Sequence, residues 1–423
     1  MDVAEPPRDW NVGALLRDRS VGILTLAQFC ISTAVALQAT ALLKQVFDIT
    51  GREFDIGLLG LAEFLPAALL VLVTGQVADR HDRRRVALMG LTGELLCSLA
   101  LAVYALSDPH EVWPLFVIAF TFGVSRAFAN PALRTMPPMV APEGALHRVI
   151  ALNSATWTSA GILGPAVSGL LYAADPSLAY FVAMGLMAIG MGGYAVVKFR
   201  RQPEPRDPDS RPSLHHALEG LRFVRRTPIL LAAISLDLFA VLFGGAVALL
   251  PVIAEERLHV GDVAYGWLRA SAGIGAAAMA LFLTVRPVNR RVGSTLLVAV
   301  GLFGTGTIVL GLTRTYAVAF AAVLVLSAAD MISVYIRGTL VPLVTPDEKR
   351  GRVIAVESVF IGASNELGAF ESGTVAAGFG TPFAVISGGV ATLVVVGLWA
   401  VLFPSLRRVD RFSDLEALPA STA

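Results

Sequence analysis

Residues 75–85 read Gly-Gln-Val-Ala-Asp-Arg-His-Asp-Arg-Arg-Arg, a short charged segment between two long apolar runs. The runs cover residues 56–78 and 86–107. A helix needs about 20 apolar residues to cross the hydrocarbon core of a bilayer. Two such runs joined by a short charged loop predict a pair of membrane-spanning helices.

The same pattern of apolar runs and short breaks continues along the whole chain. The runs that reach the length of a spanning helix cover residues 21–43, 56–78, 86–107, 113–133, 149–173, 178–198, 228–253, 263–285, 294–313, 316–340, 353–376 and 381–403. Strands of a membrane β-barrel would be about ten residues long and strictly alternating, which these runs are not. The first run follows a polar segment and is too long for a signal-peptide core, so we expect it to remain as a spanning helix. The sequence therefore predicts an all-α membrane protein with twelve transmembrane helices.

The composition supports the same class of protein. Of the 423 residues 55% are hydrophobic and 15% are charged, and the mean hydropathy is +0.70, whereas soluble domains have about 25% charged residues. The net charge of +1 provides no global basic field for nucleic acid. Six histidines and two cysteines leave little material for a metal cluster, and Cys30 and Cys97 lie in apolar runs rather than in a disulfide framework. We expect an integral membrane protein that needs no cofactor, rather than a secreted protein or a cytosolic enzyme.

The basic residues predict how the chain is oriented. With both termini in the cytoplasm, 27 lysines and arginines fall on cytoplasmic segments, among them four in residues 337–352. The opposite side keeps four, Lys44, Arg52, Arg257 and Arg314, and the remaining two, Arg126 and Arg269, lie inside spans. This bias is the positive-inside rule and requires an even number of spans. We therefore expect a multi-pass protein of the cytoplasmic (inner) membrane with both ends inside.

The chain also repeats itself at an offset of 204 residues. Between residues 138 and 169 twelve of 32 positions are identical to those 204 residues later, including Arg148–Ala151 and Arg352–Ala355. We predict an N-terminal six-helix half over residues 1–199, a cytoplasmic linker over 200–217 that is rich in proline, and a C-terminal six-helix half over 218–423. Parallel repeats of this kind are a transporter architecture with the substrate site between the halves, near mid-membrane.

The charged segment at residues 75–85 resembles the signature of the loop between the second and third spanning helices in the major facilitator superfamily. Gly75, Asp79, Arg80, Arg83 and Arg84 match the signature, and Asp82 replaces its second glycine. The resemblance implies a conformational latch that docks on the other half and stabilises the outward-open state. The simpler reading of the arginines is a positive-inside anchor.

A docking partner for this latch is predicted at the start of span 11. Thr345-Pro-Asp-Glu348 has the pattern of a capping box with proline at the first helical position. The positive end of that helix would attract Asp79.

Span 5 carries a second signature. Gly161, Gly164, Pro165 and Gly169 resemble the superfamily's antiporter-type motif, with Ser168 in place of one glycine. The resemblance implies export in exchange for protons. A kinked helix that packs closely against its neighbours is expected in either case.

The last third narrows the resemblance to the enterobactin-exporter-like and multidrug efflux branch, through residues 350–373 and Phe403-Pro-Ser-Leu-Arg-Arg408. The superfamily resemblance covers essentially the whole chain. It implies a monomer that exports siderophores, drugs or other small amphipathic molecules and uses protons as the coupling ion.

Ionised residues inside spans are costly and therefore need a reason. Arg126 and Asp330 are separated by the repeat offset, so they are candidates to face each other across the cavity as a charge pair or proton-linked switch; Arg126 could instead reach cytoplasmic water. Asp237 is a second candidate proton carrier. Glu63 and Arg269 occupy corresponding places and could interact.

Other polar residues in the spans are weaker candidates for proton exchange or for the substrate path. Glu366 and Glu371 lie deep in span 11, where they either exchange protons or bridge helices. Gln28, Gln38 and Asn130 could line a substrate path, whereas Glu94 and Glu357 are interpreted as structural.

Three rival functions were weighed. An enzyme is disfavoured because the chain has no HExxH, GxSxG or Walker motif, and the glycines of 301–306 lie inside a span. A lysolipid or lipid flippase and a nutrient importer share the same fold and remain open. We expect a secondary exporter that works by proton antiport with alternating access.

Overall fold

The structure is a computed structural model that describes residues 10–200 and 214–416. The predicted proline-rich linker therefore lies largely outside the described residues. Within the described ranges all regular secondary structure is helical.

Each predicted apolar run coincides with a long helix. In chain order these are α2 (Arg19–Thr50), α3 (Glu53–Arg80), α4 (Arg83–Leu106), α5 (Trp113–Arg134), α7 (Leu146–Ala174), α8 (Pro176–Val196), α10 (Pro228–Phe243), α12 (Asp262–Val285), α13 (Val292–Leu312), α14 (Tyr316–Val344), α15 (Asp347–Phe379) and α16 (Thr381–Leu402). The helix after α10 is irregular and continues through η1 (Gly245–Leu249), α11 (Leu250–Val252) and η2 (Ile253–Arg257). Shorter helices are α1 (Val12–Arg17), α6 (Met136–Val140), α9 (Leu214–Arg226), α17 (Pro404–Arg407) and α18 (Ser413–Glu416).

Ten helical stretches of the described chain are long and apolar enough to cross a membrane. The helices α3 and α7, of 28 and 29 residues, pack among them. The chain is therefore a multi-pass membrane protein.

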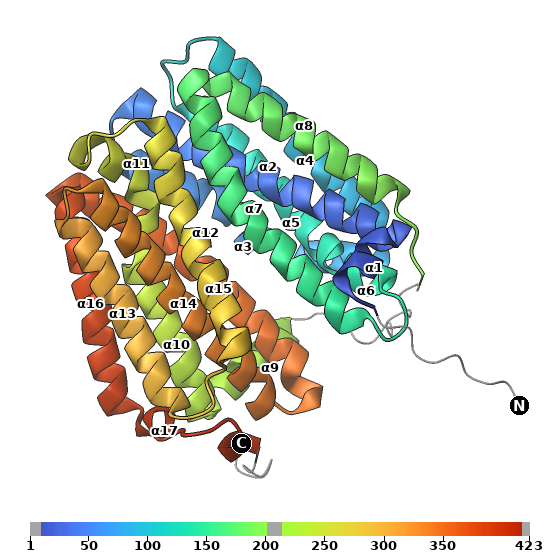
Figure 1. The fold of residues 1–423 in the computed structure, drawn as a ribbon, viewed down its shortest axis with the longest axis vertical. Coiled ribbons are helices and arrows are strands. Elements are labelled where there is room, and N and C mark those ends of the chain that lie inside the picture. Colours follow the sequence, from blue (N-terminus) through green and yellow to red (C-terminus); the bar gives the residue numbers. More distant parts are fainter. Residues whose placement is uncertain (1–9, 201–213, 417–423) are drawn as a thin grey trace, which may run out of the picture.

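Two groups of helices can be distinguished by their buried apolar residues. One core cluster draws on residues 15–197 and surrounds α2, which packs on α7 and α8 while α4 packs on α5 and α8. Another cluster draws on residues 223–415, where α13 packs on α14 and α16 and α10 packs on α15. A third joins Phe47 and Ile56 to residues 246–385. Figure 1 shows the blue-to-green helices and the yellow-to-red helices meeting near α11 and diverging toward α1 and α17.

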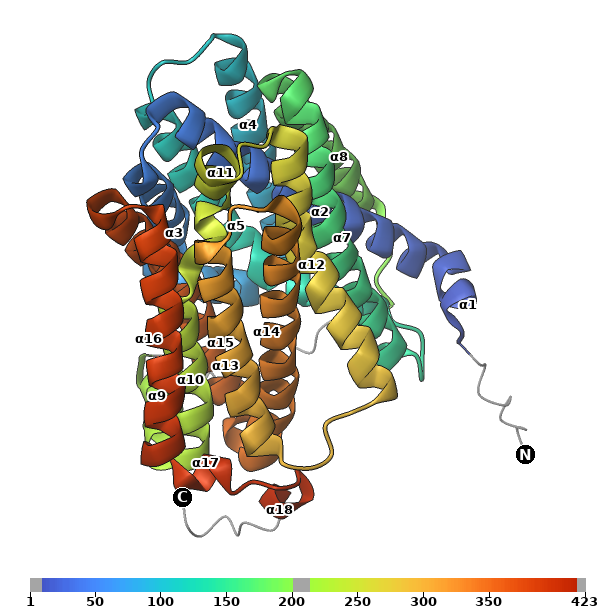
Figure 2. The same cartoon turned by 60° about the vertical axis from the view of Figure 1, so that its left-hand side comes forward.

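The two groups touch mainly through two helix pairs, α7 with α12 and α3 with α15. Figure 2 shows α7 beside α12. Glycines allow the backbones to approach at each crossing. A Cβ on Gly169 would lie 2.8 Å from the Cα of Gly266, and one on Gly373 would lie 2.9 Å from the Cα of Gly57. Gly169 and Gly373 are separated by 204 residues, so the sequence repeat maps onto the two contacts.

The predicted capping box at the start of α15 is wrong. Pro346 is the N-cap residue and caps with no side chain, and the helix begins at Asp347. The hydroxyl of Thr345 instead donates a hydrogen bond to the carbonyl of Val341, at 2.6 Å. Because α14 extends to Val344, this threonine is used to end one helix rather than to start the next.

Candidate functional site

A cavity of about 390 Å³ lies between the two groups of helices. Eight helical elements contribute to its wall: α2, α3, α10, η1, α12, α13, α14 and α15. Most lining residues are apolar or small, and the polar and charged ones are Glu63, Arg269, Ser327, Asp330, Asn365 and Glu366. A mostly apolar cavity of this size with a few convergent polar groups suits a small organic molecule.

Glu63 and Glu366 form one charged cluster at this cavity, with Arg126 and Arg269 within electrostatic range of both carboxylates. The close crossing of α3 and α15 positions the pair, because a Cβ on Gly60 would lie 3.0 Å from Oε2 of Glu366. Arg126 and Arg269 are thus the cationic neighbours of these two carboxylates, and the structure gives Glu63 and Arg269, which we expected to interact, an electrostatic contact without an ion pair within 4.0 Å among the described residues.

A second charged cluster centres on Arg337, a residue that we expected on a cytoplasmic segment. This expectation is wrong, because Arg337 is a residue of α14 and is only 3% exposed. Its guanidinium lies 2.8 Å from Asp237 and 3.3 Å from Glu357. The burial is compensated because one cation is shared by two carboxylates.

Asp330 lies beside this second cluster and lines the central cavity. A small adjoining pocket brings it together with Asp237, Ser333 and Phe303. Its electrostatic neighbours are Asp237 and Arg337, and no ion pair to it is found in the described parts of the chain. Arg337 is already occupied, so Asp330 is a carboxylate without its own counter-ion.

The structure does not bring Arg126 and Asp330 together as an ion pair. Arg126 is on α5, near Glu63, Glu94 and Glu366. Residues at corresponding positions of a repeat face each other only when both helices border the central axis between the halves and are rotated so that both side chains point toward it. Here each of the two residues has charged neighbours of its own, the carboxylates of Glu63, Glu94 and Glu366 for Arg126, and Asp237 and Arg337 for Asp330.

Several other predicted path residues lie away from the cavity wall. Gln38 is buried and accepts a hydrogen bond from Ser98, and Gln28 accepts one from Tyr194 at 2.5 Å. Asn130 and Glu371 are likewise absent from the cavity lining. The two glutamines hold helices of the first group together in this conformation.

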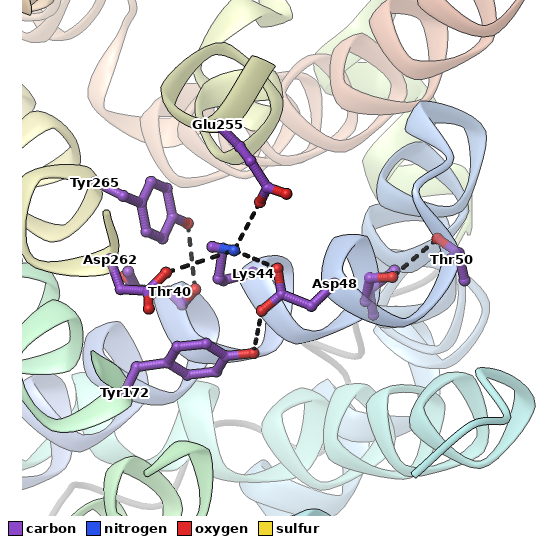
Figure 3. A network of polar contacts seen from close by, with 9 residues as sticks. Thr40, Lys44, Asp48, Thr50, Tyr172, Glu255, Asp262 and Tyr265 are labelled. Carbon is purple, nitrogen blue, oxygen red and sulfur yellow. Dashed lines mark hydrogen bonds and ion pairs between the residues drawn. The ribbon is translucent and has the colours of Figure 1, made fainter. Parts of the chain in front are cut away.

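A polar network surrounds Lys44 near the C-terminal end of α2, as Figure 3 shows. The ammonium bonds Asp48 of its own helix and lies 2.8 Å from Glu255 and 3.4 Å from Asp262. Tyr172 donates a hydrogen bond to Asp48 at 2.7 Å. The network ties α2 and α7 to η2 and α12, so it joins the two groups of helices.

Sequence reasoning missed this network. Lys44 was expected in a loop, but α2 continues to Thr50 and leaves the lysine 8% exposed. The available signal was the spacing of four residues between Lys44 and Asp48, which places both on one helix face.

The structure describes only part of the signature in the loop at residues 75–85. Asp82 caps α4 by accepting hydrogen bonds from the backbone N–H groups of Arg84 and Arg85, so the residue that replaces the glycine has a capping role. Arg84 donates to the carbonyls of Ala195 and Val197, which ties it to the end of α8. The side chains of the remaining signature residues Gly75, Asp79 and Arg80 lie outside the described residues, and Arg83 precedes Arg84 at the start of α4.

The signature of span 5 is a packing surface with two faces. A Cβ on Gly164 would lie 2.6 Å from that of Ala36, and Ser168 donates a hydrogen bond to the carbonyl of Leu37 at 2.9 Å. Gly169 and the carbonyl of Pro165 contact Gly266. Thus α7 packs on α2 with one face and on α12 with the other.

Long apolar helices in two groups, an internal repeat and a cavity between the groups define a membrane transporter of the major facilitator type. The family described as transmembrane secretion effectors matches residues 14–419, and the chain belongs to this family. The family is one of transporters, so the chain is a transporter and not an enzyme.

The chain resembles named efflux proteins. It is 27% identical over 386 residues to the multidrug efflux pump Tap of Mycolicibacterium fortuitum, which covers 86% of this chain and 91% of that protein. It is 24% identical to the enterobactin exporter EntS of Escherichia coli, over 93% of each chain. These similarities place it in the efflux branch.

A solved structure confirms the type of fold. A bacterial homologue of the human lysosomal transporter Spinster, in an inward-facing and occupied conformation, superposes with a TM-score of 0.72. The match covers 95% of this chain and 99% of that one at 14% sequence identity.

Proposed function

We propose that the protein exports small amphipathic molecules, drug-like compounds or siderophores, in exchange for protons by alternating access. It acts as a monomer in the cytoplasmic membrane. The observation that carries this proposal is the cavity between the two groups of helices, which has ionisable side chains in its wall, while the Lys44 network joins the two groups.

The moving parts are two six-helix halves, residues 1–199 and 218–423, joined by the linker 200–217. The separate apolar cores support this division, as do the two glycine crossings related by the repeat offset. When the two halves rock about these glycine crossings of α7 with α12 and of α3 with α15, few close contacts between helices need to change.

The Lys44 network closes the extracytoplasmic side in this proposal. The bias of basic residues supports a cytoplasmic position for both termini, and α11 and the start of α12, next to the network, lie at the end where the halves meet, away from α1 and α17. The conformation is then inward-facing. Cargo enters from the cytoplasm, and opening requires Lys44 to leave Glu255 and Asp262.

Proton coupling is assigned to the cavity carboxylates. Glu63, Asp330 and Glu366 share the space that cargo would occupy, and Asp330 has no counter-ion of its own. A carboxylate in a poorly hydrated cavity is stable when it binds a proton or when a cation approaches it. Binding of protons and binding of a cationic cargo can therefore exclude each other at these carboxylates.

The test is uptake into inverted membrane vesicles with an imposed pH gradient, acid inside. The probes are ethidium, as an amphipathic cation, and a catecholate siderophore. We expect uptake of a probe by wild type that collapses with the gradient, and no such uptake by Asp330→Asn. Glu143→Gln, which removes an exposed loop carboxylate, is the control.

Other results would redirect the proposal. Normal gradient-dependent uptake by Asp330→Asn rejects the role of this residue. Probe accumulation only in right-side-out vesicles indicates an importer, and movement of labelled lysolipid between leaflets without either probe indicates a flippase.

A further inference from the structure

Glu94 is a buried carboxylic acid that the proposed cavity chemistry does not use. It lies on α4 inside the N-terminal group of helices and is 2% exposed. Its Oε2 has no hydrogen-bond partner among the residues that the structure describes. An isolated carboxylate is very costly in such surroundings, whereas the protonated acid is neutral and can be accommodated.

The helices around Glu94 supply a single cation. Arg126 comes from α5, while α8 contributes the neutral Tyr194, whose hydroxyl is bound to Gln28 of α2. On its own helix the nearest polar groups are Cys97 and Ser98, the latter bound to the carbonyl of Glu94 and to Gln38 of α2. Any change in the charge of Glu94 therefore depends on Arg126.

A close helix crossing sets Glu94 and Arg126 at the same level of the bundle. A Cβ on Gly93 would lie 2.3 Å from Oγ of Ser125, and one on Gly90 would lie 2.8 Å from the backbone N of Ala129. Glu94 and Arg126 each directly follow a residue of the first contact. The two glycines thus bring α4 and α5 together where the acid and the guanidinium lie.

The same arginine also lies within electrostatic range of two carboxylates of the cavity wall. On another face of α5, a Cβ on Gly123 would lie 2.3 Å from the carbonyl oxygen of Glu63, so α3 packs directly on α5 one turn before Arg126. Arg126 is within electrostatic range of Glu63 and Glu366 as well as of Glu94. No ion pair within 4.0 Å commits it to any of the three in the part of the chain that the structure describes.

We propose that Glu94 is a proton-binding site of the N-terminal half, separate from the cargo cavity, and that Arg126 links the two. When Arg126 pairs with the cavity carboxylates, Glu94 keeps its proton. When protons or a cationic cargo neutralise Glu63 and Glu366, Arg126 turns to Glu94, whose proton leaves to cavity water. The inference deepens the proposed antiport and rests on it only for its role in transport.

The protonation claim is tested without cargo. Purified protein in lipid nanodiscs is titrated with pH while the infrared absorption of protonated carboxyl groups is recorded. We expect a band that disappears with rising pH and is missing in Glu94→Gln but kept in Glu143→Gln. In Arg126→Met the band should persist to higher pH, because the only nearby cation is gone.

The transport claim uses the same variants with ethidium as the probe. We expect Glu94→Gln to exchange labelled for unlabelled ethidium across vesicles as wild type does, and to lose accumulation driven by the pH gradient. Retained exchange also shows that the variant folds.

The outcomes separate this inference from the proposed function. An infrared band unchanged by Glu94→Gln, or one that never titrates, overturns the proton site whatever the transport result. Gradient-driven accumulation equal to wild type in Glu94→Gln overturns its role in coupling. If wild type itself accumulates neither ethidium nor siderophore, the proposed function fails while the infrared result still decides the protonation of Glu94.

Discussion

The ammonium of Lys44 lies 2.8 Å from the carboxylate of Glu255, a residue 211 positions further along the chain. Asp48 and Asp262 complete a group of three carboxylates around this one cation. Their mutual repulsion is offset only while the lysine remains among them. The network therefore favours a conformation in which α2 and η2 are held together.

We expect Lys44→Met to weaken the closure of this end. Glu255 is about half exposed, so the lost attraction is on the order of 1 kcal/mol, about a fivefold change in population. Spin labels at Asp108→Cys and Arg314→Cys, in loops on the two groups of helices, would report it as a shift toward longer distances. Cys30 and Cys97 must first be replaced.

A charge swap distinguishes an ionic contact from a packing effect. Lys44→Glu combined with Glu255→Lys keeps the charges of the network and should restore part of the short-distance population that Lys44→Glu alone loses. Distance distributions that are identical in wild type and Lys44→Met would refute the closing role of the lysine.

Arg337 is predicted to be a stability determinant. Arg337→Met leaves Asp237 and Glu357 buried without a counter-ion, and breaking a buried pair in this way costs about 3–5 kcal/mol. Thermal unfolding in mild detergent should show a large loss for this variant. Removing a carboxylate as well, in Arg337→Met with Asp237→Asn, should recover much of it; a double variant as unstable as the single one would contradict the argument.

Asp175 provides a pH-dependent contribution outside the membrane spans. The hydroxyl of Ser177, together with its backbone N–H at 2.7 Å, holds the pKa of this carboxyl below its usual range. A lowered pKa in the folded state stabilises the protein above the usual carboxyl pKa, and this stability is lost as the pH falls through the lowered value.

Melting temperatures across the acidic range check this prediction. Asp175→Ala should melt lower than wild type near neutral pH, and the difference should shrink as the pH falls. Asp175→Asn keeps a capping side chain and should lie between the two. A wild-type advantage that stays constant into strong acid would exclude the linkage.

The spans were predictable because the bilayer fixes their length and apolar character, and each predicted run coincides with a long helix. The ends were not, because hydropathy falls off at a charged residue even when the helix continues. Lys44 was expected in a loop and Arg337 on a cytoplasmic segment, although both are buried residues of the long helices α2 and α14. What holds them there is a partner distant in sequence, which no local window contains.

The cost of an ionised residue inside a span predicts Glu63, Arg269, Asp330 and Glu366 as functional candidates, and these side chains line the cavity. It could not predict which charges meet, since that depends on helix rotation and on crossing points. Glu94 shows the limit most clearly. Its position next to a glycine contact with α5 is a property of the packed pair of helices.

The glycine crossing of α7 and α12 yields the last prediction. Gly169→Ala would place a Cβ 2.5 Å from the carbonyl oxygen of Asp262, so the helices must separate at a cost of about 1–3 kcal/mol. We expect the spin labels to report opening near Lys44 and gradient-driven uptake to fall. Gly161→Ala on the same helix meets nothing within 4 Å and should behave as wild type. Equal effects of the two substitutions would mean that helix propensity, rather than the crossing, sets the position of the halves.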